Sequence, residues 1–256
     1  MSNRLKEAFD TERKLLSIYF TAGYPNIDDT RSIIRELQDS GADMIEIGLP
    51  FSDPLADGPT IQASSTHALK NGMSTDLLFE QLQGIRDEID IPLLIMGYFN
   101  PVLQYGVERF CKRCQELGID GLILPDLPLA EYQLHYEQTF KKHGLANVFL
   151  ITPQTSDTRI KQIDQASDGF IYMVSSASTT GVQDGFAQDK QAYFDRIAGM
   201  NLNNPTIVGF GIGDAQSFRS ATSRANGAII GSAFIRMLTS EGVGGIKPFI
   251  SSILKG

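Results

Sequence analysis

Residues 33–48 read IIRELQDSGADMIEIG, and this stretch contains the structural unit that decides the fold. Ile33 and Leu37 are spaced to lie on one face of an amphipathic helix. Gly41 is placed to end that helix, because glycine readily adopts the left-handed conformation that closes many helices. The run Met44–Gly48 is short and almost continuously apolar, which is typical of a parallel strand covered on both faces. The stretch therefore predicts a helix, a glycine and a buried strand.

The same unit recurs along the whole chain. Glycine also precedes later apolar runs, at Gly118, Gly144, Gly169 and Gly227, where we expect the same left-handed helix end. Helical spacing fills the intervals, as in the predicted helix 78–89. Together with Met44–Gly48, eight runs have the length of strands; the other seven are Leu16–Thr21, Ile91–Met96, Gly121–Leu124, Asn147–Ile151, Phe170–Val174, Thr206–Gly209 and Gly227–Ile230.

Eight strands alternating with helices in 256 residues predict an α/β protein with a (β/α)8 TIM barrel. An open, doubly wound sheet is the alternative, although it usually has fewer strands. Because no Pro/Ser-rich linker or charge run divides the chain, we expect a single domain over residues 1–256.

Three segments are additional to the repeated unit. Asn3–Thr11 is expected to form an extra N-terminal helix that covers the floor of the barrel. Pro59–Asn71 is expected to form an extra helix after the second strand. Ser175–Lys190 is the longest irregular segment, and a long loop inside a compact domain usually has a function or is disordered.

Composition and charge exclude several classes of function. The chain has 22 Lys and Arg against 30 Asp and Glu, a net charge of −8, and 42% hydrophobic residues, which is ordinary for a globular protein. An acidic chain without a basic cluster is not expected to bind nucleic acid or an anionic membrane. No apolar run approaches the roughly 20 residues of a membrane span, and the first residues are polar. We therefore predict a soluble, cytoplasmic protein.

Cys111 and Cys114 form a CxxC pattern, which can indicate redox chemistry or half of a zinc site. They share a helical face with the apolar residues Phe110 and Leu117, and the chain has no further cysteines to complete a four-ligand zinc site. We expect two buried thiols that act as small apolar side chains.

Glu46 is the first candidate for catalysis. Strand alternation places the two isoleucines beside it on the helix side, so Glu46 should point into the barrel. Apolar surroundings raise the pKa of a carboxyl group, which suits a general acid or base. The alternative is a Glu that forms a structural salt bridge.

The loop LPFSDPLADGPT, residues 49–60, supplies two further carboxylates. It contains three prolines in ten residues, and this stiffness would hold Asp53 and Asp57 in fixed positions. An Asp before Gly is often only a turn residue, so Asp57 gains weight chiefly from its expected proximity to Glu46.

Glycines at the ends of the last two strands predict a phosphate site. GFGI at 209–212 and Gly231-Ser232 follow strands seven and eight, and a short helical stretch comes next. Many TIM barrels bind phosphate there, with backbone N–H groups at the helix start holding the anion. Thr180 and Gly181 could add donors. The alternative is a pair of tight turns without a ligand.

Two absences limit the chemistry. None of the ten lysines follows a strand, which disfavours a Schiff-base aldolase. The three histidines, His67, His135 and His143, all fall in helical stretches, so we expect no metal site. Carboxylates and a phosphate anchor remain, which leaves proton transfer or carbon–carbon cleavage without metal or imine.

The chain resembles the tryptophan synthase alpha chain family over nearly its whole length. The shared segments, in order, are YFTAGYP at 19–25, EIGLPFSDPLADGPTIQ at 46–62, Thr180-Gly181, GFGI at 209–212 and GSA at 231–233. The second segment is long and specific, whereas many phosphate-binding barrels share the glycine motifs. The resemblance implies a retro-aldol cleavage of indole-3-glycerol phosphate to indole and glyceraldehyde 3-phosphate.

The resemblance also implies partners and cofactors. The partner would be a tryptophan synthase beta chain in an alpha2beta2 tetramer; it would receive indole through a tunnel and carry the pyridoxal phosphate. This chain itself would hold no cofactor and no metal. Asp53 would lie near the beta-chain interface.

Roles for individual residues follow from the same resemblance. Glu46 would be the general acid and base, and Asp57 would hydrogen-bond the indole N–H. Phe20 and Tyr172 would contact the indole and glycerol parts. The phosphate would be surrounded by Thr180, Gly181, Gly211, Gly231 and Ser232.

The segment Ser175–Lys190 would be the lid, mobile without ligand and ordered over bound phosphate. Many members have an Arg followed by Gly near the start of the lid, but residues 175–181 here read SSASTTG. Closure through such an arginine is therefore not expected.

Three other functions stay open. One is a different sugar-phosphate isomerase or epimerase, which the loop at 49–60 disfavours. Another is a stand-alone lyase that releases indole without a beta chain. The third is a binding module without catalysis, which the presence of both Glu46 and Asp57 disfavours.

Overall fold

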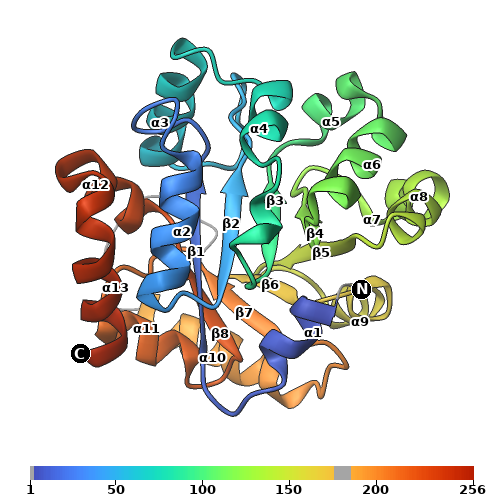
Figure 1. Ribbon diagram of the computed structural model, residues 1–256. Coiled ribbons are helices and arrows are strands. Elements are labelled where there is room, and N and C mark those ends of the chain that lie inside the picture. Colours follow the sequence, from blue (N-terminus) through green and yellow to red (C-terminus); the bar gives the residue numbers. More distant parts are fainter. Residues whose placement is uncertain (1–2, 176–185) are drawn as a thin grey trace.

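Eight parallel strands close into a barrel in the order of the chain (Figure 1). The computed structural model describes residues 3–175 and 186–256. Each strand pairs in parallel with the next, and β1 also pairs with β8. The strands are β1 (Leu15–Thr21), β2 (Met44–Gly48), β3 (Leu93–Met96), β4 (Gly121–Ile123), β5 (Ala146–Ile151), β6 (Ile171–Val174), β7 (Thr206–Gly209) and β8 (Gly227–Ile230).

The predicted TIM barrel is confirmed, and the predicted strands are correct to within two residues at each end. The largest difference is at β3, which begins at Leu93 instead of Ile91. Pro92 has no N–H with which to join the strand ladder, although its carbonyl accepts a bond from Ile45 N.

Helices surround the barrel. They are α1 (Asn3–Phe9), α2 (Thr30–Ser40), α3 (Pro59–Lys70), α4 (Thr75–Gln81), α5 (Phe99–Tyr105), α6 (Val107–Leu117), α7 (Leu129–Glu131), α8 (Glu137–Lys142), α9 (Asp157–Ala166), α10 (Phe186–Gly199), α11 (Ala215–Thr222), α12 (Ser232–Glu241) and α13 (Ile246–Lys255). Short 3₁₀ segments are η1 (Ile85–Asp87) and η3 (Val243–Gly245), and a π-helical segment is η2 (Tyr132–Tyr136). Both predicted extra helices, α1 and α3, are present. None of the described helices is long and apolar enough to cross a membrane.

Three of the five predicted glycines follow helices in the left-handed conformation: Gly41, Gly118 and Gly144 have φ angles of 100°, 71° and 68°. The expectation for Gly169 was wrong, because α9 ends at Ala166, its cap is the extended Ser167, and Gly169 has φ 153°. The expectation for Gly227 was wrong, because this residue is the first of β8 and is not among the glycines with positive φ. A Cβ atom there would lie 2.5 Å from the carbonyl oxygen of Leu15, so close strand approach requires the glycine.

Two predicted segments differ in their boundaries. The helix expected over residues 78–89 is interrupted, since α4 ends at Gln81 and Gly84 adopts φ 69° before η1. The apolar residues of the segment are buried nevertheless. The irregular segment expected over 175–190 is also shorter, because α10 begins at Phe186. The remainder of that predicted lid, 176–185, lies outside the described residues.

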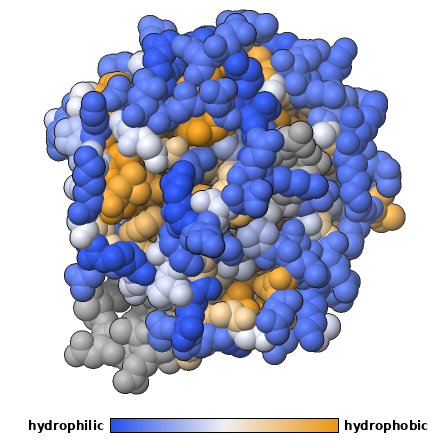
Figure 2. Space-filling model, turned by 60° about the horizontal axis from the view of Figure 1, so that its bottom comes forward, coloured by the Kyte–Doolittle hydropathy of each residue, from blue (hydrophilic) through white to orange (hydrophobic). Residues whose placement is uncertain are grey.

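The hydrophobic core has two layers. One lies inside the barrel and includes Tyr19, Met44 and Tyr172; the other lies between the strands and the helices and includes Phe20. Helix α1 lies at the bottom of the barrel in Figure 1, where Leu5 joins the inner layer. Viewed from below, the surface is mainly hydrophilic, with apolar atoms chiefly in its hollows (Figure 2).

A buried carboxylate connects several elements at the floor of the barrel through hydrogen bonds. Asp120, at the start of β4, is fully buried and accepts bonds from Arg4 Nε at 3.0 Å, Arg86 Nη2 at 2.5 Å and Leu93 N at 2.9 Å. These donors come from α1, η1 and β3, so one side chain joins the extra helix to two strands.

The CxxC pattern lies on α6, and both thiols are free and buried, as predicted. Burial raises the pKa of Cys111 to about 12, and that of Cys114 is also well above the usual range. Both groups therefore stay protonated and serve as packing.

Candidate active site

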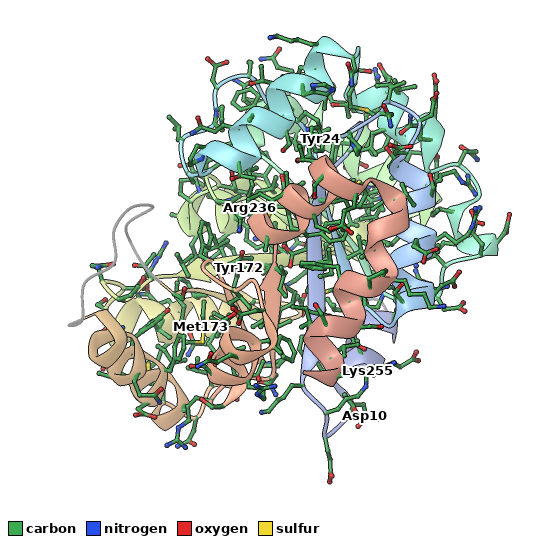
Figure 3. All side chains as sticks on the ribbon, turned by 90° about the vertical axis from the view of Figure 1, so that its left-hand side faces the viewer. Asp10, Tyr24, Tyr172, Met173, Arg236 and Lys255 are labelled. Atoms are coloured by element: carbon green, nitrogen blue, oxygen red, sulfur yellow. The ribbon has the colours of Figure 1, made fainter. Side chains whose placement is uncertain are left out.

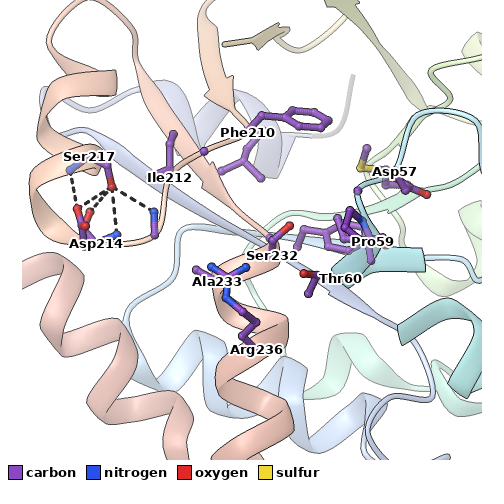
Figure 4. A pocket seen from close by; sticks show the side chains of 18 residues that line it. Asp57, Pro59, Thr60, Phe210, Ile212, Asp214, Ser217, Ser232, Ala233 and Arg236 are labelled. Carbon is purple, nitrogen blue, oxygen red and sulfur yellow. Dashed lines mark hydrogen bonds between the residues drawn. The ribbon is translucent and has the colours of Figure 1, made fainter. Parts of the chain in front are cut away.

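A cavity of about 610 Å³ opens at the carboxyl ends of the strands (Figure 4). Its walls come from elements that are far apart in the sequence: β1, β3, the loop after β2, the loop after β7, and the junction of β8 with α12. This is the end of a TIM barrel at which active sites form.

Glu46 lies in the interior of the barrel, as strand alternation predicts. It pairs in register with Tyr19 on β1, and its side chain is fully buried. Ser17 Oγ donates a hydrogen bond of 3.0 Å to Oε1, whereas Oε2 has no partner among the described residues. The salt-bridge alternative is therefore wrong for the described part of the chain, where no cation lies within 4.0 Å of this carboxylate.

Burial raises the pKa of Glu46 to about 8, and the hydrogen bond from Ser17 opposes this rise only in part. At neutral pH the carboxyl group therefore holds its proton for much of the time. A neutral carboxyl in this position can donate a proton, and its conjugate base can take one back. Glu46 is not itself part of the cavity wall; Tyr19, its cross-strand neighbour, is.

Asp57 is part of the cavity wall, at the start of the segment that leads into α3. Tyr98, which follows β3, donates its hydroxyl to Asp57 Oδ2 at 3.1 Å and accepts a bond from Ala56 N at 3.0 Å. Burial raises the pKa of the Asp57 carboxyl, and the hydrogen bond from Tyr98 lowers it. The Asp57 side chain is thus held by a residue from the segment between β3 and α5.

Sequence reasoning missed Tyr98. Its ring packs against Phe51 with centroids 5.3 Å apart, so it contacts the loop at two points. Its position two residues after a barrel strand was the signal that could have identified it. A small cavity of about 20 Å³ lies beside Tyr98 and shares Asp57 and Tyr19 with the main cavity.

The prediction that Phe20 contacts a ligand was wrong. Phe20 is fully buried in the layer between strands and helices, and it does not line the cavity. Tyr19 lines it instead, because Tyr19 pairs with the inward-facing Glu46 and adjacent strand residues point to opposite faces. Alternation, applied to β1 as it was to β2, identifies the correct aromatic residue.

Tyr172 also points into the barrel interior. It is almost fully buried, and its ring meets that of Phe210 edge-on, with centroids 6.3 Å apart. Burial, followed by the charges of Glu46 and Asp57, raises the pKa of its hydroxyl, so both carboxylates lie near this ring. The structure thus brings Tyr172 together with both candidate acids.

The predicted phosphate end of the site lies on the opposite wall from Asp57 (Figure 4). Gly211, Gly231 and Ser232 all line the cavity there. Helix α12 begins at Ser232, and the N–H groups of a first helical turn have no partner within the helix. Gly211 has φ 72°, a conformation that side chains disfavour. Thr180 and Gly181 lie outside the described residues.

The other candidates lie away from the cavity. Asp53 is exposed and accepts a hydrogen bond from Ser52, and the nearby Leu55 is 90% exposed.

Among the described residues, no group of three or more His, Cys, Asp or Glu side chains could hold a metal ion. His67 lies in α3, His135 in η2 and His143 at the end of α8, where Glu108 and Gln115 contact its ring.

The arrangement can therefore perform proton transfer at one end of a cavity and hold an anion at the other. Glu46 and Asp57 differ in their surroundings, since one is sealed in the barrel and the other is bonded to a tyrosine at the cavity wall. Two carboxyl groups in different environments can take different protonation states at one pH.

Comparison with known proteins supports a family assignment. Residues 5–247 match the model of the family described as tryptophan synthase alpha chain. The chain is 63% identical over 251 residues to the tryptophan synthase alpha chain of Flavobacterium psychrophilum, covering 98% of this chain and 99% of that protein. It is 55% identical to that of Parabacteroides distasonis, covering 93% of both chains.

Solved structures agree with the sequence comparison. The structure of tryptophan synthase subunit alpha from Legionella pneumophila has a TM-score of 0.89 and 32% identity, covering 99% of this chain and 97% of that one. A chain of the aminoacrylate-bound tryptophan synthase of M. tuberculosis has a TM-score of 0.87 and 30% identity, covering 98% of both chains.

Proposed function

The chain belongs to the tryptophan synthase alpha chain family, lyases of tryptophan biosynthesis, and we propose that it cleaves indole-3-glycerol phosphate to indole and glyceraldehyde 3-phosphate. The observation that carries this proposal is Glu46, a buried carboxyl group inside the barrel with one oxygen that has no partner among the described residues.

The reaction breaks the bond between C3 of the indole and C3′ of the glycerol chain. A retro-aldol cleavage needs a proton delivered to indole C3 and a proton removed from the C3′ hydroxyl, which becomes the aldehyde. A pKa of about 8 for Glu46 suits both transfers, because the group can hold a proton and release it near neutral pH. We assign both steps to Glu46.

Asp57 is assigned to the indole nitrogen. Protonation of C3 places positive charge on the ring, and a carboxylate accepting the indole N–H stabilises that charge. The hydrogen bond from Tyr98 supports this role, because it favours the charged form of Asp57 and fixes its orientation. A preorganised charge of this kind needs no rearrangement in the transition state.

The remaining contacts divide between the two ends of the substrate. Tyr19 takes the place that the resemblance gave to Phe20, and Tyr172 lies beside both carboxylates. Gly211, Gly231 and Ser232 are assigned to the phosphate, with Thr180 and Gly181 as further donors by family resemblance. Helix α12 supports this assignment, because its free N–H groups begin at the cavity wall.

A beta chain is the proposed partner, in an alpha2beta2 tetramer in which only the beta chain holds pyridoxal phosphate. The family resemblance implies this partner, and one of the solved relatives is described as tryptophan synthase. The family resemblance assigns the beta-chain contact to the loop that contains Asp53, and this loop is exposed, with Leu55 at 90% exposure. That loop would therefore link the partner to the catalytic carboxylate.

The test is release of glyceraldehyde 3-phosphate from indole-3-glycerol phosphate, followed through a coupled dehydrogenase. We expect Glu46→Gln to reduce the rate by at least 1,000-fold, in the range seen when an essential proton donor is removed. The matched control is Glu80→Gln, which changes an exposed glutamate of α4 and should keep the wild-type rate. A Glu46→Gln protein with normal activity would remove Glu46 from the reaction.

A further inference from the structure

Arg236 projects from α12 at the wall of the main cavity (Figures 3 and 4). It follows Ser232 by four positions, so the two residues share a face of the helix. Helical side chains lean toward the helix N-terminus, which carries the guanidinium back toward the first turn of α12. Figure 4 shows its nitrogen atoms beside Ala233, on the side of the cavity where the Ser232 hydroxyl lies.

The Arg236 guanidinium forms no salt bridge with a carboxylate whose side chain is described. Among the residues whose side chains are described, 4–175 and 191–256, no carboxylate forms an ion pair with Arg236 within 4.0 Å, although many arginines of this part of the chain have one. Asp214, one of the two carboxylates on the wall, accepts hydrogen bonds from Ser217 N and Ser217 Oγ, both at 2.7 Å. The positive charge is therefore available to a ligand.

Arg236 is important for anion binding because the described wall of the cavity is otherwise negatively charged. The described wall contains two carboxylates, Asp57 and Asp214, and Arg236 is the one Lys or Arg among the described wall residues. The chain as a whole has a net charge of −8. Without Arg236, the described part of the wall would offer a phosphate dianion only backbone N–H groups and uncharged side chains such as Ser232 against this negative background.

We propose that Arg236 binds the phosphate group of the substrate and makes the site selective for phosphorylated ligands. This inference rests on the proposed function. Guanidinium groups donate paired hydrogen bonds to phosphate and keep their charge at any physiological pH. Arg236 thus supplies a positive charge for the phosphate, whereas Gly211, Gly231 and Ser232 form the wall around it.

Kinetics of three variants test the proposal. For Arg236→Gln we expect KM for indole-3-glycerol phosphate to rise about 10-fold, with kcat changed less than 2-fold, because the phosphate is remote from the bond that breaks. Arg236→Lys should recover part of the affinity, since it keeps the charge but loses the paired geometry. The control, Arg219→Gln, removes an exposed charge near Asp214 that is not part of the cavity wall, and KM should stay unchanged.

Ionic strength separates a phosphate contact from a structural role. Salt screens an exposed charge pair, so KM of the wild type should rise with salt more steeply than KM of Arg236→Gln. Equal salt dependence, or an unchanged KM in the variant, would overturn the proposal while leaving the cleavage reaction standing.

Binding of inorganic phosphate, measured by 31P NMR, gives a readout that does not depend on catalysis. We expect the dissociation constant to rise several-fold in Arg236→Gln and to remain unchanged in Arg219→Gln. This result without any cleavage by the wild type would support the anion site and refute the proposed function. Equal phosphate binding by wild type and Arg236→Gln, or none by the wild type, would refute the role of Arg236.

Discussion

Glu46 occupies a position where a charged group is unfavourable, and this should be visible in the stability of the protein. Its pKa is about 8 in the folded protein and 4.5 without burial, so between these values the folded state binds more protons than the unfolded state. The contribution of Glu46 to stability is therefore fully present below pH 4.5 and is lost as pH rises toward 8. Near neutral pH, Glu46 therefore retains only part of this stabilising contribution.

Glu46→Gln should remove this dependence on pH. The free energy of unfolding of the variant, relative to wild type, should increase by about 1.4 kcal/mol for each pH unit between roughly pH 5 and 8. Urea unfolding at pH 5, 6 and 7 measures the trend, with Glu80→Gln as the control. A difference that stays constant across this range would show that Glu46 titrates normally.

Tyr98 should act on the reaction through Asp57. Tyr98→Phe removes the donor that lowers the pKa of this carboxyl, so the Asp57 pKa should rise. The acid limb of the pH profile of kcat should move to higher pH, and kcat near neutral pH should fall about 10-fold. Tyr105→Phe is the matched control, because Tyr105 lies at the end of α5 and is not among the residues of either cavity that Asp57 lines. A lower kcat with an unshifted profile would contradict a role for Tyr98 through Asp57.

At the scale of elements, the carboxyl ends of β2 and β7 are glycines because tyrosine rings fill the space beside them. A Cβ atom at Gly209 would lie 2.2 Å from the Tyr172 hydroxyl, and one at Gly48 would lie 2.3 Å from the Tyr19 hydroxyl. Neither glycine has a positive φ, so the close contact is the reason for the residue. The strands thereby leave room for aromatic side chains at the base of the site.

Gly209→Ala should therefore displace Tyr172 and damage the site. We expect kcat/KM to fall at least 10-fold and the free energy of unfolding to fall by about 1–3 kcal/mol, the usual cost of overpacking. Gly244→Ala is the control, because no atom lies within 4 Å of a Cβ atom built there. Activity assays and urea unfolding of both variants test this expectation. If Gly209→Ala and Gly244→Ala have the same kcat/KM and the same free energy of unfolding, close contact with Tyr172 is not the reason for the glycine at position 209.

Elements were predictable where one physical signal governs them. The runs that became β2, β7 and β8 are apolar and bounded by turns, so their limits agree with the structure. The helix over 78–89 was predicted as continuous because apolar spacing alone does not reveal that Gly84 turns the backbone. Gly227 was misassigned because a glycine before a strand can serve a close strand contact as well as a helix end.

The candidate site was predictable to a similar degree. Glu46, Asp57 and the glycines at the phosphate end could be identified because strand alternation and the ends of barrel strands locate them. The role of Phe20 rested on the family resemblance alone, whereas strand alternation places Tyr19 on the same face as Glu46. Tyr98 and Arg236 were missed because their roles depend on contacts between distant segments, which spacing along the chain does not show.

At the scale of the whole molecule, Asp120 joins α1, η1 and β3 at the end of the barrel opposite the site. Asp120→Asn would leave Arg86 partly buried beside a neutral group, and we expect a loss of about 3–5 kcal/mol in the free energy of unfolding. Asp28→Asn changes an exposed aspartate and should cost less than about 0.5 kcal/mol. Urea unfolding compares the two variants, and similar stabilities would show that the buried network contributes little.

We propose that Glu46, buried inside the barrel, transfers the protons needed to cleave a carbon–carbon bond, and that a beta chain accelerates this reaction. The measurement to make is the rate of glyceraldehyde 3-phosphate release from indole-3-glycerol phosphate by wild type and Glu46→Gln, each alone and with a beta chain added. We expect slow release by wild type alone, a large increase with the beta chain, and no measurable release by Glu46→Gln in either case. Equal release by wild type and Glu46→Gln, or none by folded wild type with its partner, would refute the proposed role of Glu46.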